Sequence, residues 1–172
     1  MIKAIVYTSK TGTTEWYAER IGTEKNLPVL TLKEAEKKLE KGSGIIYLGC
    51  IRADIISGLD KAKALFSPSV IVGVGMTKSG ERTREVLKAN NLDSSAALFT
   101  LQGGYVPSRL KGIEKLILSL VVKKEIKNLE RKEKRTKEDE EMLSLLKNGG
   151  VIRDQEKLNE IMSALDEMEK RQ

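Results

Sequence analysis

Five short apolar runs recur in the first 101 residues of this 172-residue chain, at residues 2–8, 27–32, 44–49, 70–75 and 96–101. Most of these runs are continuous rather than alternating, which is typical of β-strands that are covered on both faces. Strands of this kind belong to parallel sheets that carry helices on each side. The runs therefore constrain the fold more than any other feature of the sequence.

Helical patterns lie between the apolar runs, at residues 15–21, 33–41, 59–66 and 82–90. Gly22, Gly42 and Pro68 follow the first three, and we expect them to end those helices. Strands and helices that alternate at this spacing indicate right-handed βαβ units. The sequence thus predicts an α/β fold, a doubly wound parallel sheet with helices on both faces, whose ligands bind at the carboxyl ends of the strands.

The last third of the chain departs from this rhythm, because residues 107–150 contain no further strand pattern. Helical spacing of apolar residues begins at Leu110 and continues to Val122, with more apolar surface than a solvated helix needs. Residues 130–141 have no apolar side chain and should be exposed. Within them, Thr136 and Asp139 resemble a capping box that opens a helix ending near residues 148–150.

A final helix is expected from about residue 155 to residue 170, because Leu158, Ile161 and Leu165 share one face. That pattern suits a helix closing one side of the sheet. We interpret residues 1–172 as a single domain in which a helical insertion at about 107–150 separates the last strand from this closing helix.

The segment that most directly indicates chemistry is the turn from the first strand into the first helix. It consists of Thr8, Ser9, Lys10, Thr11, Gly12, Thr13 and Thr14. The unpaired amides and the dipole of a helix N-terminus attract anions, hydroxyl groups can donate to a phosphate, and Gly12 permits a tight turn. A monophosphate is the ligand that this pattern favours, and a threonine-rich turn that only caps the helix is the structural alternative.

Residues 5–21 resemble the flavodoxin signature, with an apolar pair and an aromatic residue before Ser9, then Gly12, Thr14, Ala18 and Ile21 in the family's positions. The resemblance covers the five-strand pattern and the final helix. It implies a flavodoxin-like sheet of five parallel strands in the order 2-1-3-4-5. It also implies that the loop from Thr8 to Thr14 binds the phosphate of FMN, and that the protein is a flavoprotein in electron transport or an oxidoreductase.

In the flavodoxin family, the loops after the third and fourth strands contact the flavin ring. The corresponding residues are Cys50, Ile51, Arg52 and Ala53, followed by Met76, Thr77 and Lys78. Arg52 could place a positive charge near the reduced flavin, or it could be a surface residue paired with Asp54. Cys50 could be a redox thiol, or it could simply pack at the end of a strand. Neither loop contains an aromatic residue, unlike ordinary electron-shuttle flavodoxins.

A looser resemblance extends to the menaquinone-dependent protoporphyrinogen oxidase branch. It rests on residues 49–52, on residues 101–107 and on the position of the basic insertion. It implies a membrane-associated enzyme that passes electrons to a quinone, with Gly104 and Tyr105 as candidate contacts to substrate or ring. Tyr105 could also be a tyrosine at a loop edge without such a role.

The charge pattern bears on possible partners. The net charge is +6, and residues 107–150 contain 12 Lys and Arg against 8 Asp and Glu. An apolar face with basic flanks at residues 107–127 could dock to anionic lipid, dock to a protein partner, or cover an edge of the sheet. Nucleic acid is not expected as a partner, because acidic residues interrupt the basic ones and aromatic residues make up only 4%.

Residue usage limits the remaining function classes. The chain has one cysteine, Cys50, and no histidine, so neither a zinc site nor a Cys–His catalytic pair is expected. The N-terminal segment does not resemble a signal peptide, which predicts a cytoplasmic protein that could lie against the inner face of the membrane. We expect an FMN-dependent electron carrier or oxidoreductase that works with a redox partner protein or a quinone. The competing hypothesis is a flavin-free module that binds a protein partner.

Overall fold

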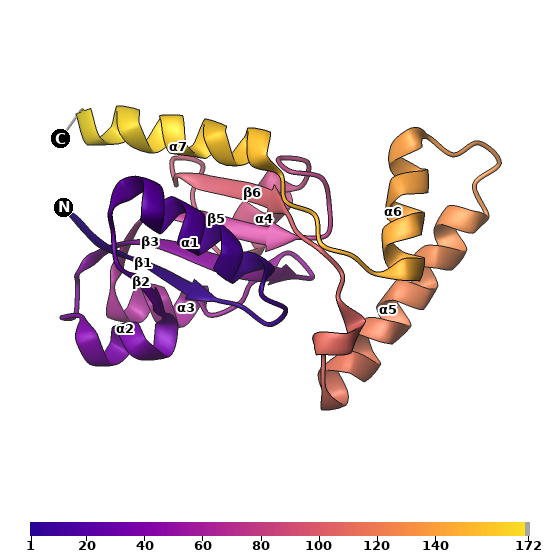
Figure 1. The fold of residues 1–172 in the computed structure, drawn as a ribbon, viewed down its shortest axis with the longest axis horizontal. Helices are drawn as coiled ribbons and strands as arrows, with labels where there is room; N and C mark the ends of the chain where they lie inside the picture. Colours follow the sequence, from indigo (N-terminus) through magenta and orange to yellow (C-terminus); the bar gives the residue numbers. More distant parts are fainter. Residues whose placement is uncertain (171–172) are drawn as a thin grey trace. The chain divides into compact units, whose positions relative to one another are not determined.

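A central parallel sheet organises the larger part of the protein in the computed structural model, which describes residues 1–170 apart from the side chains of Glu114 and Glu169. The chain divides into two compact units (Figure 1). Unit 1 comprises residues 1–103 and 153–170, and unit 2 comprises residues 104–152.

The sheet of unit 1 has its strands in the order β2-β1-β3-β5-β6, and all of these strands are parallel. The strands are β1 (Ile2–Thr8), β2 (Val29–Thr31), β3 (Gly44–Arg52), β5 (Ser67–Gly75) and β6 (Leu98–Gln102). This arrangement confirms the predicted doubly wound order of the five main strands. The strand count differs by one short element, β4 (Ile55–Ile56), which pairs antiparallel with the end of β3.

Helices cover both faces of the sheet. They are α1 (Thr13–Lys25), α2 (Leu32–Lys38), α3 (Leu59–Leu65), α4 (Thr83–Ala89) and α7 (Gln155–Lys170). Buried residues of α1 and α7 pack with one face of the strands, whereas those of α2, α3 and α4 pack with the other face. The continuous apolar runs are therefore explained, because neighbouring side chains of one strand enter opposite cores.

Helix α1 runs past the residue expected to end it. Gly22 lies inside the helix, and Asn26, with φ of 50°, provides the left-handed end instead. A Cβ at position 22 would overlap Cγ2 of Val29 and lie 3.1 Å from the carbonyl oxygen of Leu27. The glycine is thus explained by the close approach of α1 to β2 rather than by a helix end.

Tyr17 connects three elements of unit 1 through one buried side chain. Its hydroxyl donates to the carbonyl oxygen of Gln102 and accepts from the backbone N–H of Asp154, each at 2.7 Å. Burial is the main reason that the pKa of Tyr17 lies above its ordinary value. These bonds tie α1 to the end of β6 and to the start of α7.

Unit 2 is built mainly from two helices, α5 (Gly112–Glu130) and α6 (Lys137–Asn148), which pack against each other (Figure 1). A short 3₁₀-helix at Pro107–Arg109 precedes them. The predicted capping box is confirmed, since Thr136 and Asp139 each accept a hydrogen bond from the other's backbone N–H. Within residues 1–170 no helix is both long enough and apolar enough to cross a membrane.

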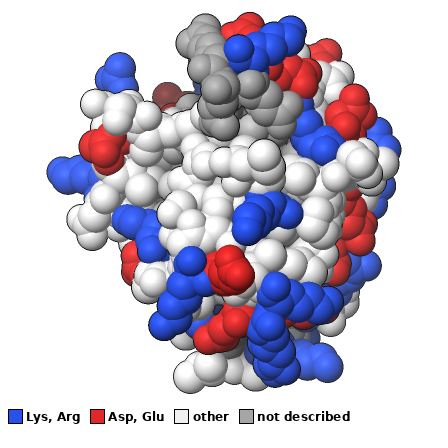
Figure 2. Space-filling model, turned by 90° about the vertical axis from the view of Figure 1, so that its left-hand side faces the viewer, with Lys and Arg blue, Asp and Glu red and all other residues white. Residues whose placement is uncertain are grey.

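Charged side chains of both signs are mixed on the face of the molecule that Figure 2 shows. Lys and Arg lie beside Asp and Glu there, around an area without charged groups. This face therefore has no broad region of a single charge.

Candidate functional site

The loop between β1 and α1 lies where the fold favours a ligand. The chain runs from β1 to β2 on one side and then crosses to β3 on the other side, so the direction of winding reverses at β1. In doubly wound sheets, ligands bind beyond the carboxyl ends of the strands at such a reversal. Thr8 ends β1 and Thr13 begins α1, so residues 9–12 form the loop at this position.

The loop is shaped by Ser9 and Gly12. The backbone N–H of Gly12 donates to Oγ of Ser9 at 3.1 Å, and Gly12 has φ of 89°, a left-handed conformation that favours glycine. Gly12 is the N-cap residue of α1 and makes no side-chain cap hydrogen bond. The unpaired amides at this helix start are chemically suited to a bound anion.

Thr13 and Thr14 occupy the first turn of α1, and their side chains are buried. Thr13 is only 5% exposed, and its Oγ1 is a buried side-chain oxygen without a hydrogen-bond partner within residues 1–170. Burying a hydroxyl without a partner costs about 1–3 kcal/mol. A ligand that accepted a hydrogen bond from this group would recover that cost.

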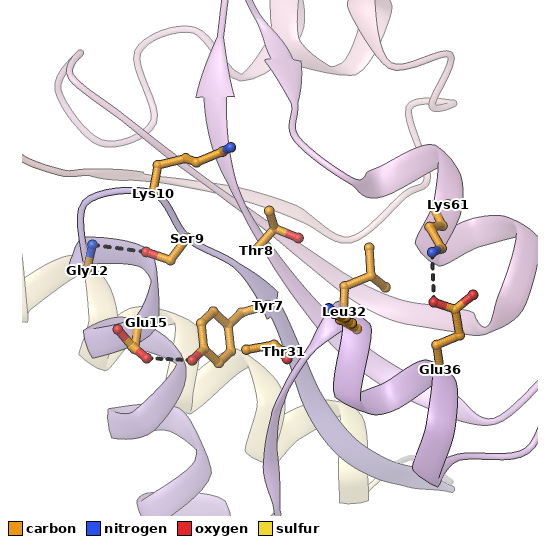
Figure 3. A pocket seen from close by; sticks show the side chains of 11 residues that line it. Tyr7, Thr8, Ser9, Lys10, Gly12, Glu15, Thr31, Leu32, Glu36 and Lys61 are labelled. Atoms are coloured by element: carbon orange, nitrogen blue, oxygen red, sulfur yellow. Dashed lines mark hydrogen bonds and ion pairs between the residues drawn. The ribbon is translucent and has the colours of Figure 1, made fainter. Parts of the chain in front are cut away.

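A pocket of about 600 Å³ opens beside the loop (Figure 3). Among the predicted phosphate-loop residues, Thr8, Ser9, Lys10 and Gly12 line it, whereas Thr11, Thr13 and Thr14 do not. The other lining residues, which sequence reasoning did not assign to a site, are Tyr7, Glu15, Thr31, Leu32, Lys33, Glu36 and Lys61. Its volume is in the range of small-molecule sites.

Hydrogen bonds already engage both carboxylates of the pocket. The hydroxyl of Tyr7 donates to Oε1 of Glu15 at 2.5 Å, and Nζ of Lys61 donates to Oε2 of Glu36 at 2.8 Å (Figure 3). Burial, and then the hydrogen bond to Glu15, raises the pKa of Tyr7 above its ordinary value. The two glutamates are therefore less repulsive to an anionic ligand than isolated carboxylates would be.

Thr8 differs from the rest of the loop, because its hydroxyl lies 2.9 Å from the hydroxyl of Tyr47. Tyr47 donates its own proton to the carbonyl oxygen of Ser57 at 2.7 Å, so Thr8 is the donor in the bond between the two hydroxyls. Burial raises the pKa of Tyr47 to about 12, which keeps it protonated. Thr8 therefore has no hydroxyl proton left for a phosphate.

The first predicted ring loop is largely strand. Cys50, Ile51 and Arg52 belong to β3, which continues past the expected end at Gly49 because β4 pairs with it. Ala53 and Asp54 form the turn, with φ of 46° and 64°.

Side chains near this turn make specific contacts of their own. The thiol of Cys50 donates to Oγ of Ser57 at 3.3 Å. Asp54 receives two hydrogen bonds from the guanidinium of Arg82, which hold the pKa of the Asp54 carboxyl below its ordinary value. Asp54 thus connects the turn to the start of α4.

The second predicted ring loop, with Met76, Thr77 and Lys78, directly follows β5. It is held to its surroundings by Ser79, whose hydroxyl donates to Asp154 and accepts from the backbone N–H of Gln102. The side-chain amide of Gln102 donates in turn to the carbonyl oxygen of Met76 at 3.1 Å. The residues that line the pocket include none from either predicted ring loop.

Gly104 and Tyr105 belong to unit 2. Tyr105 forms an antiparallel bridge with Gly150, and its side chain is only 8% exposed. A Cβ at Gly104 would overlap the carbonyl oxygen of Gly150, which explains the glycine by the close approach of two backbones.

Some of the pocket-lining residues that were not predicted could have been identified from the sequence. Thr31 ends β2 and Leu32 and Lys33 follow it, so the rule that ligands lie at the carboxyl ends of strands could have indicated them. Glu36 and Lys61 lie on α2 and α3, and no local pattern marks them.

Residues 1–170 contain no cluster of three or more His, Cys, Asp or Glu side chains that could hold a metal ion.

No protein-family model, curated protein or solved structure matches this chain.

Proposed function

We propose that this protein binds FMN, with the phosphate at the N-terminus of α1, and that it acts in electron transfer or flavin-dependent oxidoreduction. The observation that carries the proposal is the buried hydroxyl of Thr13, which has no partner and directly follows a glycine in the left-handed conformation. A redox partner protein or a quinone would accept the electrons. The flavin would supply the redox chemistry, and the chain would supply binding and orientation.

Several groups of the loop suit a phosphate dianion. The hydroxyl of Ser9 retains its proton for donation, because its oxygen accepts from Gly12. The helix dipole of α1 adds a favourable potential at its N-terminus. Lys10 and Lys33 also line the pocket and contribute positive charge.

The adjoining pocket has room for more than a phosphate. Tyr7 provides an aromatic side chain in its wall, which the predicted ring loops lack. Aromatic side chains stack favourably on flat ring systems. We therefore expect Tyr7 to contribute to the contact with the rest of the ligand.

A second candidate is the flavin-free module that binds a protein partner. It is favoured by the absence of Cys50, Ile51, Arg52 and Ala53, and of Met76, Thr77 and Lys78, from the lining of the pocket. The two candidates differ in one simple respect, because only the first predicts saturable binding of FMN.

The test is a titration of the purified protein with FMN, in which quenching of flavin fluorescence measures binding. We expect Thr13→Val to weaken FMN binding roughly 10- to 100-fold, since a hydrogen bond to a charged group is lost. The same change should raise the free energy of unfolding of the ligand-free protein by about 1 kcal/mol, because an unpartnered buried hydroxyl is removed. Opposite signs for affinity and stability are the signature of a ligand-binding hydroxyl.

Two controls sharpen the titration. Thr23→Val changes an exposed threonine of the same helix and should leave FMN affinity unchanged. Riboflavin lacks the phosphate, so its affinity should not respond to Thr13→Val. If no FMN binds at saturating concentration, the flavin-free module becomes the better proposal; equal losses for FMN and riboflavin would remove Thr13 from the phosphate site.

A further inference from the structure

Helix α5 has apolar residues on two opposite sides. Val122 and Leu129 lie on one side of the helix and are buried. Ile113, Leu116, Ile117, Leu120 and Val121 share the other side, because their spacing follows the helical repeat, and each is 54% to 72% exposed. These five residues, here called the apolar stripe, extend over about 12 Å of the helix.

Basic residues continue the apolar stripe toward the C-terminus of α5. Lys124 follows Leu120 by four residues, Lys127 follows Lys124 by three, and Arg131 follows Lys127 by four. All three basic residues are exposed. The exposed side of α5 therefore changes from aliphatic to predominantly basic along its length.

The acidic residues do not balance this basic end. Glu125 follows Val121 by four residues and flanks the stripe, whereas Glu130 forms an ion pair with Lys147 of α6 at 2.6 Å. Lys124, Lys127 and Arg131 outnumber this flanking carboxylate. The net positive charge beside the stripe thus favours an anionic partner.

We propose that this side of α5 docks onto an anionic lipid surface. The apolar stripe lies at the boundary between headgroups and acyl chains, and Lys124, Lys127 and Arg131 contact the headgroups. Helices that lie in a membrane interface combine these features, an aliphatic face beside Lys and Arg. The proposal is independent of flavin binding, since all of its residues belong to unit 2.

Two other occupants fit the stripe less well. A stable dimer takes about 20–30 residues from each partner, and this surface offers five aliphatic and three basic residues on one helix. Protein interfaces are enriched in aromatic residues and depleted in Lys, whereas the stripe consists only of Ile, Leu and Val and continues into lysines. A fluid lipid surface needs neither a matching shape nor directed hydrogen bonds.

The experiment is flotation of the full-length protein with phosphatidylcholine vesicles, prepared with and without phosphatidylglycerol. We expect binding to the anionic vesicles only. The triple substitution Leu116→Ser, Ile117→Ser and Leu120→Ser should abolish it. The matched control is Ile55→Ser with Val151→Ser, which changes exposed aliphatic residues outside α5 and should bind as the parent does.

Charge reversal tests the basic end separately. Lys124→Glu with Lys127→Glu should weaken vesicle binding roughly tenfold or more. Lys37→Glu with Lys38→Glu on α2 changes the net charge equally, at exposed positions of unit 1, and should have little effect. Circular dichroism would confirm that each variant is folded.

Three results would overturn the proposal. The first is failure of the folded parent to float with anionic vesicles, and the second is undiminished flotation of the triple Ser variant. The third is a dimer, detected by light scattering, that the triple Ser substitution converts to monomer, because a second copy would then be the occupant of the stripe. None of these results bears on the FMN titration.

Discussion

The two units differ in how they cover their apolar residues. In unit 1 the sheet has helices on both faces, and apolar residues of every main strand belong to one of two buried clusters. In unit 2, α5 and α6 pack together, yet the apolar stripe of α5 stays exposed. The contrast teaches that helical spacing identifies residues that share a side of a helix, whereas other elements decide whether that side is covered.

The largest difference in the free energy of unfolding should be between a substitution in the core of unit 1 and one in the apolar stripe. Ile161 of α7 is fully buried, so Ile161→Ala should lower the free energy of unfolding by about 2–5 kcal/mol. Leu116→Ala on the stripe should change it by no more than about 0.5 kcal/mol. Urea denaturation followed by circular dichroism measures both. A loss for Leu116→Ala near that of Ile161→Ala would mean that the stripe is covered in the folded protein, and the comparison would fail.

A matched pair within α5 sharpens the comparison further. Val122 is 4% exposed and Val121 is 54% exposed. We expect Val122→Ala to destabilise unit 2 by about 1.5–3 kcal/mol, because two methyl groups leave a packed site. Val121→Ala should have an effect within about 0.5 kcal/mol and in the stabilising direction, since alanine is the better helix former. Hydrogen–deuterium exchange of the α5 and α6 amides measures each change locally, and equal effects would contradict the two-sided description of α5.

The smallest effect concerns a motif that both units share. Thr31 and Thr136 each open a helix with a capping box. Thr31→Ala and Thr136→Ala should each cost about 1 kcal/mol, because local hydrogen bonds of the same kind are lost. Thermal unfolding and amide exchange of α2 and α6 measure them. A clearly larger cost in one unit would show that its cap also supports tertiary contacts.

The two caps should also weaken in acid. Hydrogen bonds from Thr31 lower the pKa of Glu34 below its ordinary 4.5, and hydrogen bonds from Lys132 and Thr136 lower the pKa of Asp139 below its ordinary 3.8. A lowered pKa in the folded state stabilises the protein above the ordinary pKa, and this contribution is lost as the pH falls through the folded value. The difference between each parent and its Ala variant should therefore shrink below those ordinary values. A constant difference down to the acid limit would contradict a role for the carboxylates.

Much of unit 1 could be predicted because its signals are local. The alternation of apolar runs and helical patterns indicated the doubly wound sheet, and the structure confirms it. The turn after β1 indicated the loop that we propose as the phosphate site. Predictions that depended on distant residues were less accurate. Gly22 was predicted to end a helix because the pattern of neighbouring residues does not show that Val29 packs closely against it. The end of β3 was placed too early because β4 extends its pairing.

The candidate site shows the same division. Ser9, Gly12 and Thr13 were predicted from the turn itself, whereas the lining by Glu36 and Lys61 depends on how α2 and α3 sit beside β1. The lone hydroxyl of Thr13 also required the structure, since hydroxyl groups at helix starts normally find partners.

The sequence by itself determined the strand and helix pattern, the capping box of Thr136, and the hydroxyl-rich turn before α1. These features rest on backbone periodicity and on hydrogen bonds between chain neighbours, so a short window of residues contains them. Only the tertiary structure decided which residues line the pocket, why Gly22 is required, and which side of α5 is covered. Those outcomes depend on contacts between segments far apart in the chain, which no local pattern specifies.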